Sequence, residues 1–148
     1  MRFRREDPRA ELSRLDLFAD CTRAELGRIA LLLTRVTVPE GYVLIREGGP
    51  GDEFMVLMSG AASVRRRTLH GDDEIARLGP GDFVGELALL PERPGARRTA
   101  TVVAATDLTL GVCTPSEFRQ ILDLAPSAAE KVRRSADRRA RRLLAVSA

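Results

Sequence analysis

One segment of the sequence combines a tight glycine turn, a carboxylate and two adjacent arginines. It runs from Gly79 to Leu90 and continues, after a loop rich in proline, as Arg-Arg-Thr-Ala-Thr-Val at 97–102. A glycine such as Gly85 lets the backbone bend tightly where a strand ends. A short helical turn that begins at Glu86 would leave backbone N–H groups open to an anion.

The two charged side chains of this segment have complementary uses. Arg98 lies at the start of a predicted strand, and a guanidinium beside exposed backbone N–H groups is suited to a phosphate. A charge-assisted hydrogen bond of this kind contributes roughly 1.5–3 kcal/mol. An ionised Glu86 only accepts hydrogen bonds, so it can bind a sugar hydroxyl. The alternative is an internal salt bridge between Glu86 and Arg98 without any ligand.

This arrangement resembles the phosphate-binding cassette of the cyclic-nucleotide-binding domain family, which includes protein kinase A regulatory subunits, the catabolite activator protein and nucleotide-gated channels. The family pattern is a Gly-Glu-x-Ala-Leu turn followed by Arg-Ser/Thr/Ala-Ala, and residues 85–89 and 98–100 match it. The resemblance extends over about residues 15–144, most of the chain. It includes the turn segments at 39–41, 48, 51–54 and 58–60.

The resemblance implies a role for each cassette residue. Arg98 would pair with the equatorial oxygens of the cyclic phosphate, and backbone N–H groups of Ala88 and Thr99 would complete the phosphate cradle. Glu86, with the N–H of Gly85 nearby, would hold the ribose 2′-hydroxyl. The candidates for the apolar wall around the base and ribose are Leu87, Val64, Ile75 and Ala100.

The loop at 91–97 is longer than in common members of the family. The residues that follow it must therefore decide which of the two arginines aligns with the arginine of the family pattern. The following Ala100, Thr101 and Val102 place Arg98 in the cassette position. With a register slip of one residue, Arg97 becomes the phosphate ligand; otherwise Arg97 is expected to face solvent. Two prolines and a glycine indicate a defined surface excursion, and its extra length should cost little.

Hydrophobic periodicity predicts one domain that is mainly β, with flanking helices. Residues 7–33 are predicted to be helical, with a capping box from Thr22 to Glu25. The expected fold is an eight-stranded antiparallel β-roll, jelly-roll-like, with N-terminal helices and two C-terminal helices. Strand patterns lie at 35–38, 42–45, 54–58, 61–66, 75–78, 99–104 and 108–114.

The C-terminal part is predicted to form two helices. Thr114 or Ser116 can cap a helix that runs to about Leu124, and Pro126 suits the first turn of the next helix. By resemblance, residues 126–144 form a lid that swings over the base. Its narrow apolar stripe consists of Ala129, Val132, Ala136, Ala140 and Leu143. The candidates to contact the base are Arg133, Arg134, Arg138 and Arg139, which could instead form a solvated face or bind an acidic partner, a membrane surface or nucleic acid.

Composition limits the other possibilities. The 148 residues fit a basic tail at 1–10 and a single domain at 11–148, with the roll at about 35–114 and the hinge and lid helices at about 115–145. The single histidine, His70, argues against zinc sites and histidine-based triads, so we expect no metal, no catalytic residue and no enzyme.

Cys21 and Cys113 are expected as buried or half-buried thiols. No apolar run is long enough to span a membrane and no signal peptide is evident, so a cytoplasmic location is expected.

The sequence therefore predicts a non-enzymatic cyclic-nucleotide sensor that needs no cofactor and signals through its C-terminal helices. A threonine after the cassette arginine is compatible with cGMP, whereas the composition, rich in arginine and poor in lysine, suggests a bacterial, GC-rich genome and favours cAMP. No DNA-reading domain is visible, so the effector is expected to be a separate protein or a linked domain; a dimer is possible. The alternative is a degenerate, nucleotide-free interaction module that docks through its basic terminal segments.

Overall fold

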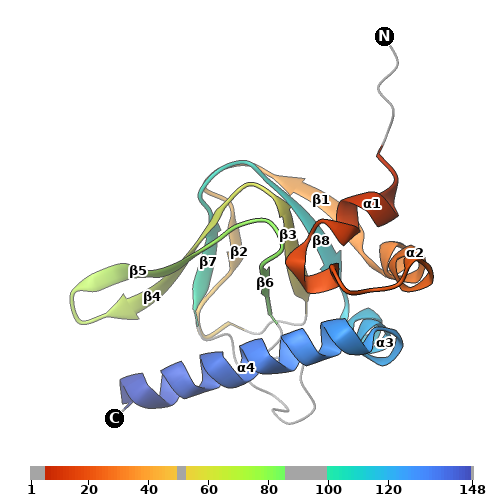
Figure 1. The fold of residues 1–148 in the computed structure, drawn as a ribbon. Helices are drawn as coiled ribbons and strands as arrows, with labels where there is room; N and C mark the ends of the chain where they lie inside the picture. The colour runs from red at the N-terminus through yellow and green to blue at the C-terminus, as the bar shows by residue number, and fades with distance from the viewer. Residues whose placement is uncertain (1–5, 50–52, 86–99, 148) are drawn as a thin grey trace.

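Two antiparallel sheets and flanking helices make up the fold (Figure 1). The computed structural model describes residues 6–49, 53–85 and 100–147, with side chains described as far as residue 139. The helices in this part of the chain are α1 (Pro8–Ser13), the 3-10 helix η1 (Asp16–Phe18), α2 (Arg23–Leu32), α3 (Pro115–Leu124) and α4 (Pro126–Ser147). The strands are β1 (Thr34–Val38), β2 (Val43–Ile45), β3 (Phe54–Ser59), β4 (Ala62–Thr68), β5 (Gly71–Leu78), β6 (Phe83–Val84), β7 (Thr101–Ala104) and β8 (Leu108–Cys113).

The strand order agrees with the predicted β-roll. The first sheet has the order β1-β8-β3-β6, and the second has the order β2-β7-β4-β5. Every pairing between neighbouring strands is antiparallel. The predicted eight-stranded antiparallel architecture with helices at both ends is therefore confirmed.

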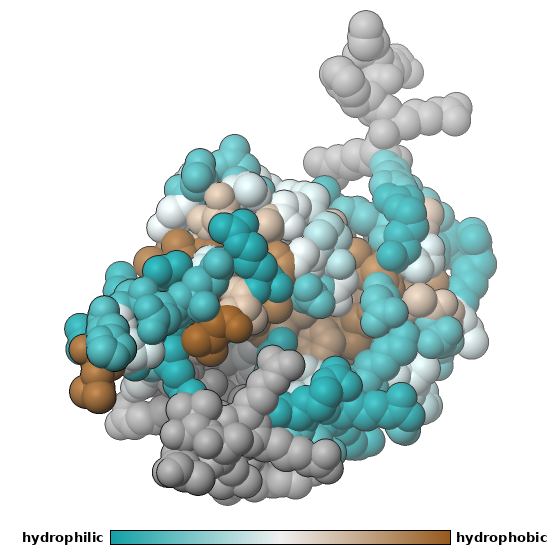
Figure 2. Space-filling model, turned by 60° about the vertical axis from the view of Figure 1, so that its left-hand side comes forward, coloured by the Kyte–Doolittle hydropathy of each residue, from teal (hydrophilic) through white to brown (hydrophobic). Residues whose placement is uncertain are grey.

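The structure differs from the prediction in the start of the fifth strand and in one additional short strand. The fifth strand was expected to begin at Ile75, but β5 begins at Gly71, because the acidic residues 72–74 lie opposite the arginines 65–67 of β4. Opposite charges on facing strands stabilise the pair although no apolar alternation signals it. The resulting hairpin is largely hydrophilic on its surface (Figure 2). The two-residue strand β6 was not predicted, because so short a strand shows no periodicity and is defined by its pairing with β3.

The apolar core has two parts on opposite sides of the first sheet. One cluster lies between that sheet and the helices, and within it the ring of Phe54 packs 4.6 Å from that of Phe118 and 5.6 Å from that of Phe83, measured between ring centroids. The other cluster fills the interior of the roll between the two sheets. β6 contributes to both, with Phe83 in the helical cluster and Val84 in the roll interior, because neighbouring side chains of a strand point to opposite faces.

The predicted helix starts are confirmed by their caps. The Thr22 side chain accepts from the N–H of Glu25, and the Glu25 side chain accepts from the N–H of Thr22. Thr114, rather than Ser116, caps α3 in the same way with Glu117. Pro126 begins α4, where its missing N–H and fixed φ suit the first turn.

The long helix α4 lies along one end of the roll (Figure 1). Of its predicted apolar stripe, Ala129, Val132 and Ala136 are buried, and Ala128 and Ser135 are buried beside them. The side chains at 140 and 143 lie outside the described part. Among the helices of the described residues, none combines the length and apolarity that crossing a bilayer requires.

Replacing Phe118 by alanine should lower the free energy of unfolding by about 3–5 kcal/mol, because the ring is buried against Phe54 and a cavity would remain. Urea denaturation followed by circular dichroism measures this change. Leu69→Ala is the control, since Leu69 is fully exposed and its replacement should change stability by no more than about 0.5 kcal/mol. Equal effects of the two substitutions would contradict the assignment of the core.

The two thiols should react very differently with a disulfide reagent such as DTNB at pH 8. Burial raises the pKa of Cys113 to about 12, and it also raises the pKa of the half-buried Cys21, whose sulfur lies 3.7 Å from the Ser127 hydroxyl. Because the thiolate is the reacting form, we expect slow labelling of Cys21 and none of Cys113 until urea is added. Rapid labelling of both thiols in native buffer would contradict this prediction.

Candidate functional site

The predicted ligand-binding residues divide into two groups. Gly85, Ala100, Val64 and Ile75 belong to the described part of the chain. The remaining five, together with the alternative phosphate ligand Arg97, lie outside the described residues: Glu86, Leu87, Ala88, Arg98 and Thr99. The structure therefore defines the two ends of the cassette motif and the surface between them.

The two ends of the motif belong to different sheets. Gly85 directly follows β6 in the first sheet, whereas Ala100 directly precedes β7 in the second. Gly85 has a φ of 97°, a backbone conformation that residues with a Cβ rarely adopt. The tight bend predicted after the strand at this glycine is thus present. Near these two ends, Val84 of β6 and Val102 of β7 are both buried in the roll interior.

Val64 and Ile75 occupy different positions relative to this interior. Val64 of β4 lies opposite Val102 of β7 and packs against the interior cluster, as its predicted inward orientation requires. Ile75 lies at a β-bulge, since Val64 pairs with Ala76 and the next residue of β4 pairs with Glu74. A bulge leaves its extra residue unpaired, and Ile75 is 52% exposed. Its role in the wall around the base stays a prediction.

A charged pair beside β7 was missed by the sequence analysis. Arg66 Nε lies 3.8 Å from Glu47 Oε1, and the backbone N–H of Glu47 donates to Thr101 Oγ1 over 3.0 Å. Thr101 directly follows Ala100, so this network adjoins the second end of the cassette motif. The sequence did contain one signal that Arg66 lies near the site. Arg66 follows Val64 by two positions in β4, so the two side chains share a face of the strand. Its partner Glu47, however, lies in a loop and is brought there only by the fold.

The structure distinguishes among the four arginines predicted on the last helix. The Arg139 side chain donates from Nη2 to the carbonyl oxygen of Phe83 over 2.9 Å, and its guanidinium carbon lies 5.6 Å from the Phe83 ring centroid. A cation over an aromatic ring adds a further attraction. Arg133, Arg134 and Arg138 are exposed. Arg139 therefore attaches α4 to β6, two residues before Gly85.

A second attachment holds the first half of α4. The Lys131 ammonium donates to the carbonyl oxygen of Asp16 over 2.5 Å and lies 3.0 Å from Asp20 Oδ2. Both partners belong to η1 or the turn that follows it. Helix α4 is thus attached at one point to the N-terminal helical segment and at another to the strand that leads into the cassette motif.

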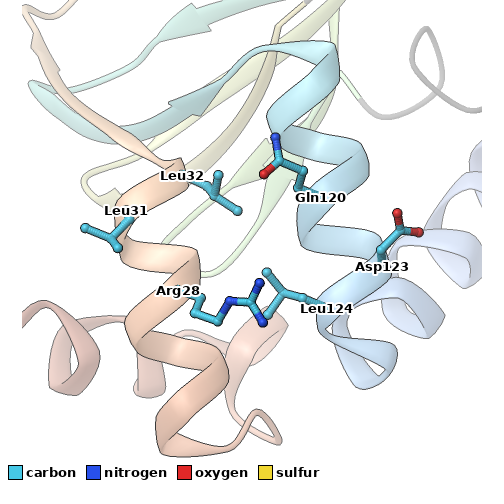
Figure 3. Close-up of a pocket in the computed structure, with 6 residues that line it drawn as sticks. All are labelled: Arg28, Leu31, Leu32, Gln120, Asp123 and Leu124. Carbon is cyan, nitrogen blue, oxygen red and sulfur yellow. The ribbon is translucent and has the colours of Figure 1, made fainter.

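A groove lies between α2 and α3 (Figure 3). It encloses about 480 Å³ and combines leucines with Arg28 and Asp123. Of the predicted ligand-binding residues that the structure describes, none lines it, and a single exposed leucine such as Leu31 is ordinary for a protein surface. In the described part of the chain, no group of three or more histidine, cysteine or acidic side chains is placed to hold a metal ion.

Gly85→Ala should destabilise the fold by about 1–3 kcal/mol, because a Cβ at this φ strains the backbone. Thermal unfolding measures the loss. Gly79→Ala is the matched control, since an added Cβ there meets open space and its φ is not in the positive region. If both variants unfold at the wild-type temperature, the bend at Gly85 does not constrain the chain.

Comparison with known proteins agrees with this geometry. The chain is 36% identical over 119 residues to the cAMP-dependent protein kinase regulatory subunit of Aspergillus fumigatus, an alignment that covers 80% of this chain and 28% of the relative. It is 36% identical over 115 residues to the acetyltransferase Pat of Mycolicibacterium smegmatis, covering 78% of this chain and 34% of the relative. The chain thus spans about a third or less of the length of these curated relatives.

A solved structure and a family model complete the comparison. The regulatory domain of Toxoplasma gondii PKA with cAMP superimposes with a TM-score of 0.68 at 26% identity, covering 83% of this chain and 45% of that one. The model of the cyclic nucleotide-binding domain matches residues 35–124, which include both ends of the cassette motif and the whole of α3. Because this match extends over more than half of the chain, the protein belongs to the cyclic-nucleotide-binding domain family.

Proposed function

We propose that the chain is a sensor that binds a cyclic nucleotide, cAMP in preference to cGMP, at the cassette 85–100 and signals through α4. The observation that carries the proposal is the placement of the motif. Its first end, Gly85, bends away from β6 at a positive φ, and its second end, Ala100, enters β7 in the opposite sheet. A ligand held by this segment would contact both sheets of the roll.

The proposed contacts follow the chemistry of a cyclic phosphodiester attached to a ribose. Arg98 pairs with the phosphate oxygens, and the backbone N–H groups of Ala88 and Thr99 donate to the same group. Glu86 accepts from the ribose 2′-hydroxyl, with Gly85 beside it. The base and ribose lie against the apolar residues Leu87, Val64, Ile75 and Ala100. These contacts bind and orient a ligand, and none of them supplies a nucleophile or a general base.

Signalling through α4 rests on its attachment beside the cassette. Arg139 binds the carbonyl oxygen of Phe83, so a movement of β6 or of the segment after it acts directly on the helix. A nucleotide shifts the position of α4 only in so far as it binds one position more tightly than the other. The effector that reads this change is proposed to be a separate protein or a linked domain, as in the relatives named for a kinase and an acetyltransferase.

The alternative function, a nucleotide-free interaction module, is favoured by one observation. Arg133, Arg134 and Arg138 expose cationic groups along α4, and such a surface attracts acidic partners. The two functions depend on different arginines, because a sensor requires Arg98 and a docking module requires the exposed residues of the helix.

Calorimetric titration with cAMP and then cGMP tests the sensor. We expect saturable binding to the wild type, tighter for cAMP, and an affinity at least about tenfold lower for Arg98→Ala, since a charge-assisted hydrogen bond contributes roughly 1.5–3 kcal/mol. Arg97→Ala is the matched control, with the same charge change one position earlier.

The titration distinguishes the register of the two arginines, the nucleotide preference and the two proposed functions. A loss of affinity in Arg97→Ala instead of Arg98→Ala would move the phosphate contact by one residue. Tighter binding of cGMP would overturn the proposed preference. Absence of heat and of thermal stabilisation with either nucleotide would overturn the sensor and leave the docking module.

A further inference from the structure

A polar cavity lies between α4 and the body of the domain. It encloses about 410 Å³. One wall is formed by α4 between Lys131 and Arg139, and the other by Asp16 of η1 together with residues 81–83. Among the described residues, its lining includes none of those proposed to contact the nucleotide, which are Val64, Ile75, Gly85 and Ala100.

The most informative residue in this cavity is Ser135. Ser135 is 7% exposed, and it lines the cavity. Within the described part of the chain its hydroxyl makes no hydrogen bond, unlike the hydroxyl of Ser13, which donates to the carbonyl of Ala10. A buried polar group without a partner costs about 1–3 kcal/mol. A ligand that accepts a hydrogen bond from this hydroxyl would recover that free energy.

The charged groups of the cavity differ in how far they are already paired. Lys131 and Arg139 are held by the attachments described above. Arg134 pairs with Glu130 at 2.9 Å, but both side chains are more than 60% exposed, so this pair is worth little. Among the described residues, Arg138 has no hydrogen bond or ion pair. Two guanidinium groups are therefore available on α4.

The opposite wall limits which ligands fit. The Asp82 carboxylate already accepts from the N–H of Gly79 over 2.8 Å, which fixes it in the turn before β6. Asp16 contributes a second carboxylate. The lining carries four basic and two acidic side chains, and Asp20 and Glu130 beside it pair with Lys131 and Arg134. A compact anion close to α4 is favoured, whereas a ligand with negative charge on both sides would meet the carboxylates.

We propose that this cavity is a second binding site, for a phosphate group. The forked guanidinium groups of Arg138 and Arg134 match phosphate oxygens, and the Ser135 hydroxyl supplies a further donor from the same helix. The volume accommodates a phosphate with a small organic substituent as readily as the free ion. Because the walls belong to α4 and to the body, the bound group would hold the helix in its docked position.

Phosphorus NMR titration of the full chain with inorganic phosphate, at constant ionic strength set with sodium chloride, tests the site. We expect saturable line broadening for the wild type and at least about tenfold weaker binding for Arg138→Gln. Ser135→Ala should also weaken binding. Arg133→Gln is the matched control, because Arg133 is exposed on the same helix and does not line the cavity.

Phosphate could also enter the cassette, and Arg98→Ala distinguishes the two sites. Retained phosphate binding in Arg98→Ala supports the cavity, whereas its loss would assign the signal to the cassette and overturn the proposal. Equal weakening by Arg138→Gln and Arg133→Gln would mean attraction by surface charge alone, and would also overturn it. Titration of the same variants with cAMP reports on the nucleotide site independently, so failure of one site is not mistaken for failure of the other.

Discussion

The packing of Phe83 joins three parts of the molecule that are distant in sequence. Its ring packs against Phe54 in the cluster beneath the helices, its carbonyl oxygen accepts from Arg139, and the neighbouring Val84 enters the roll interior. The two residues of β6 thus connect the helical layer, α4 and the first end of the cassette motif. Any change in the segment after Gly85 acts on a strand held on both faces, so it cannot be absorbed there without moving a neighbour.

Lys131 and Arg139 divide the long helix into parts with different constraints. Lys131 holds the first half of α4 to η1 and the turn after it. That part of the chain is already ordered, because Leu17 and Phe18 of η1 are buried in the helical cluster. Arg139 lies about two turns further along and contacts β6 through a hydrogen bond and its position over the Phe83 ring. The chain has no other lysine, so the first attachment is chemically distinct from the arginine contacts along the rest of the helix.

Local signals explain what could be predicted from the sequence. The capping boxes at Thr22 and Thr114 involve residues three positions apart, and the cassette motif is read from contiguous residues. The strand β6, the start of β5 and the Glu47–Arg66 pair depend on partners far along the chain, and no short-range pattern encodes them. The rotation of α4 that selects Arg139 among four arginines is likewise set by packing. The roles assigned to residues 86–99 stay predictions from the motif.

The hairpin of β4 and β5 places an unpaired strand edge at the end of the second sheet, since β5 is the last strand in its order. Open edges are templates for pairing with a further strand, which leads to aggregation. Here the edge carries consecutive acidic residues at 72–74. A second copy that paired with this edge in the register that sets residues 72–74 of the two copies opposite each other would bring like charges together. The same charges that pair the hairpin internally therefore oppose polymerisation through this strand in that register.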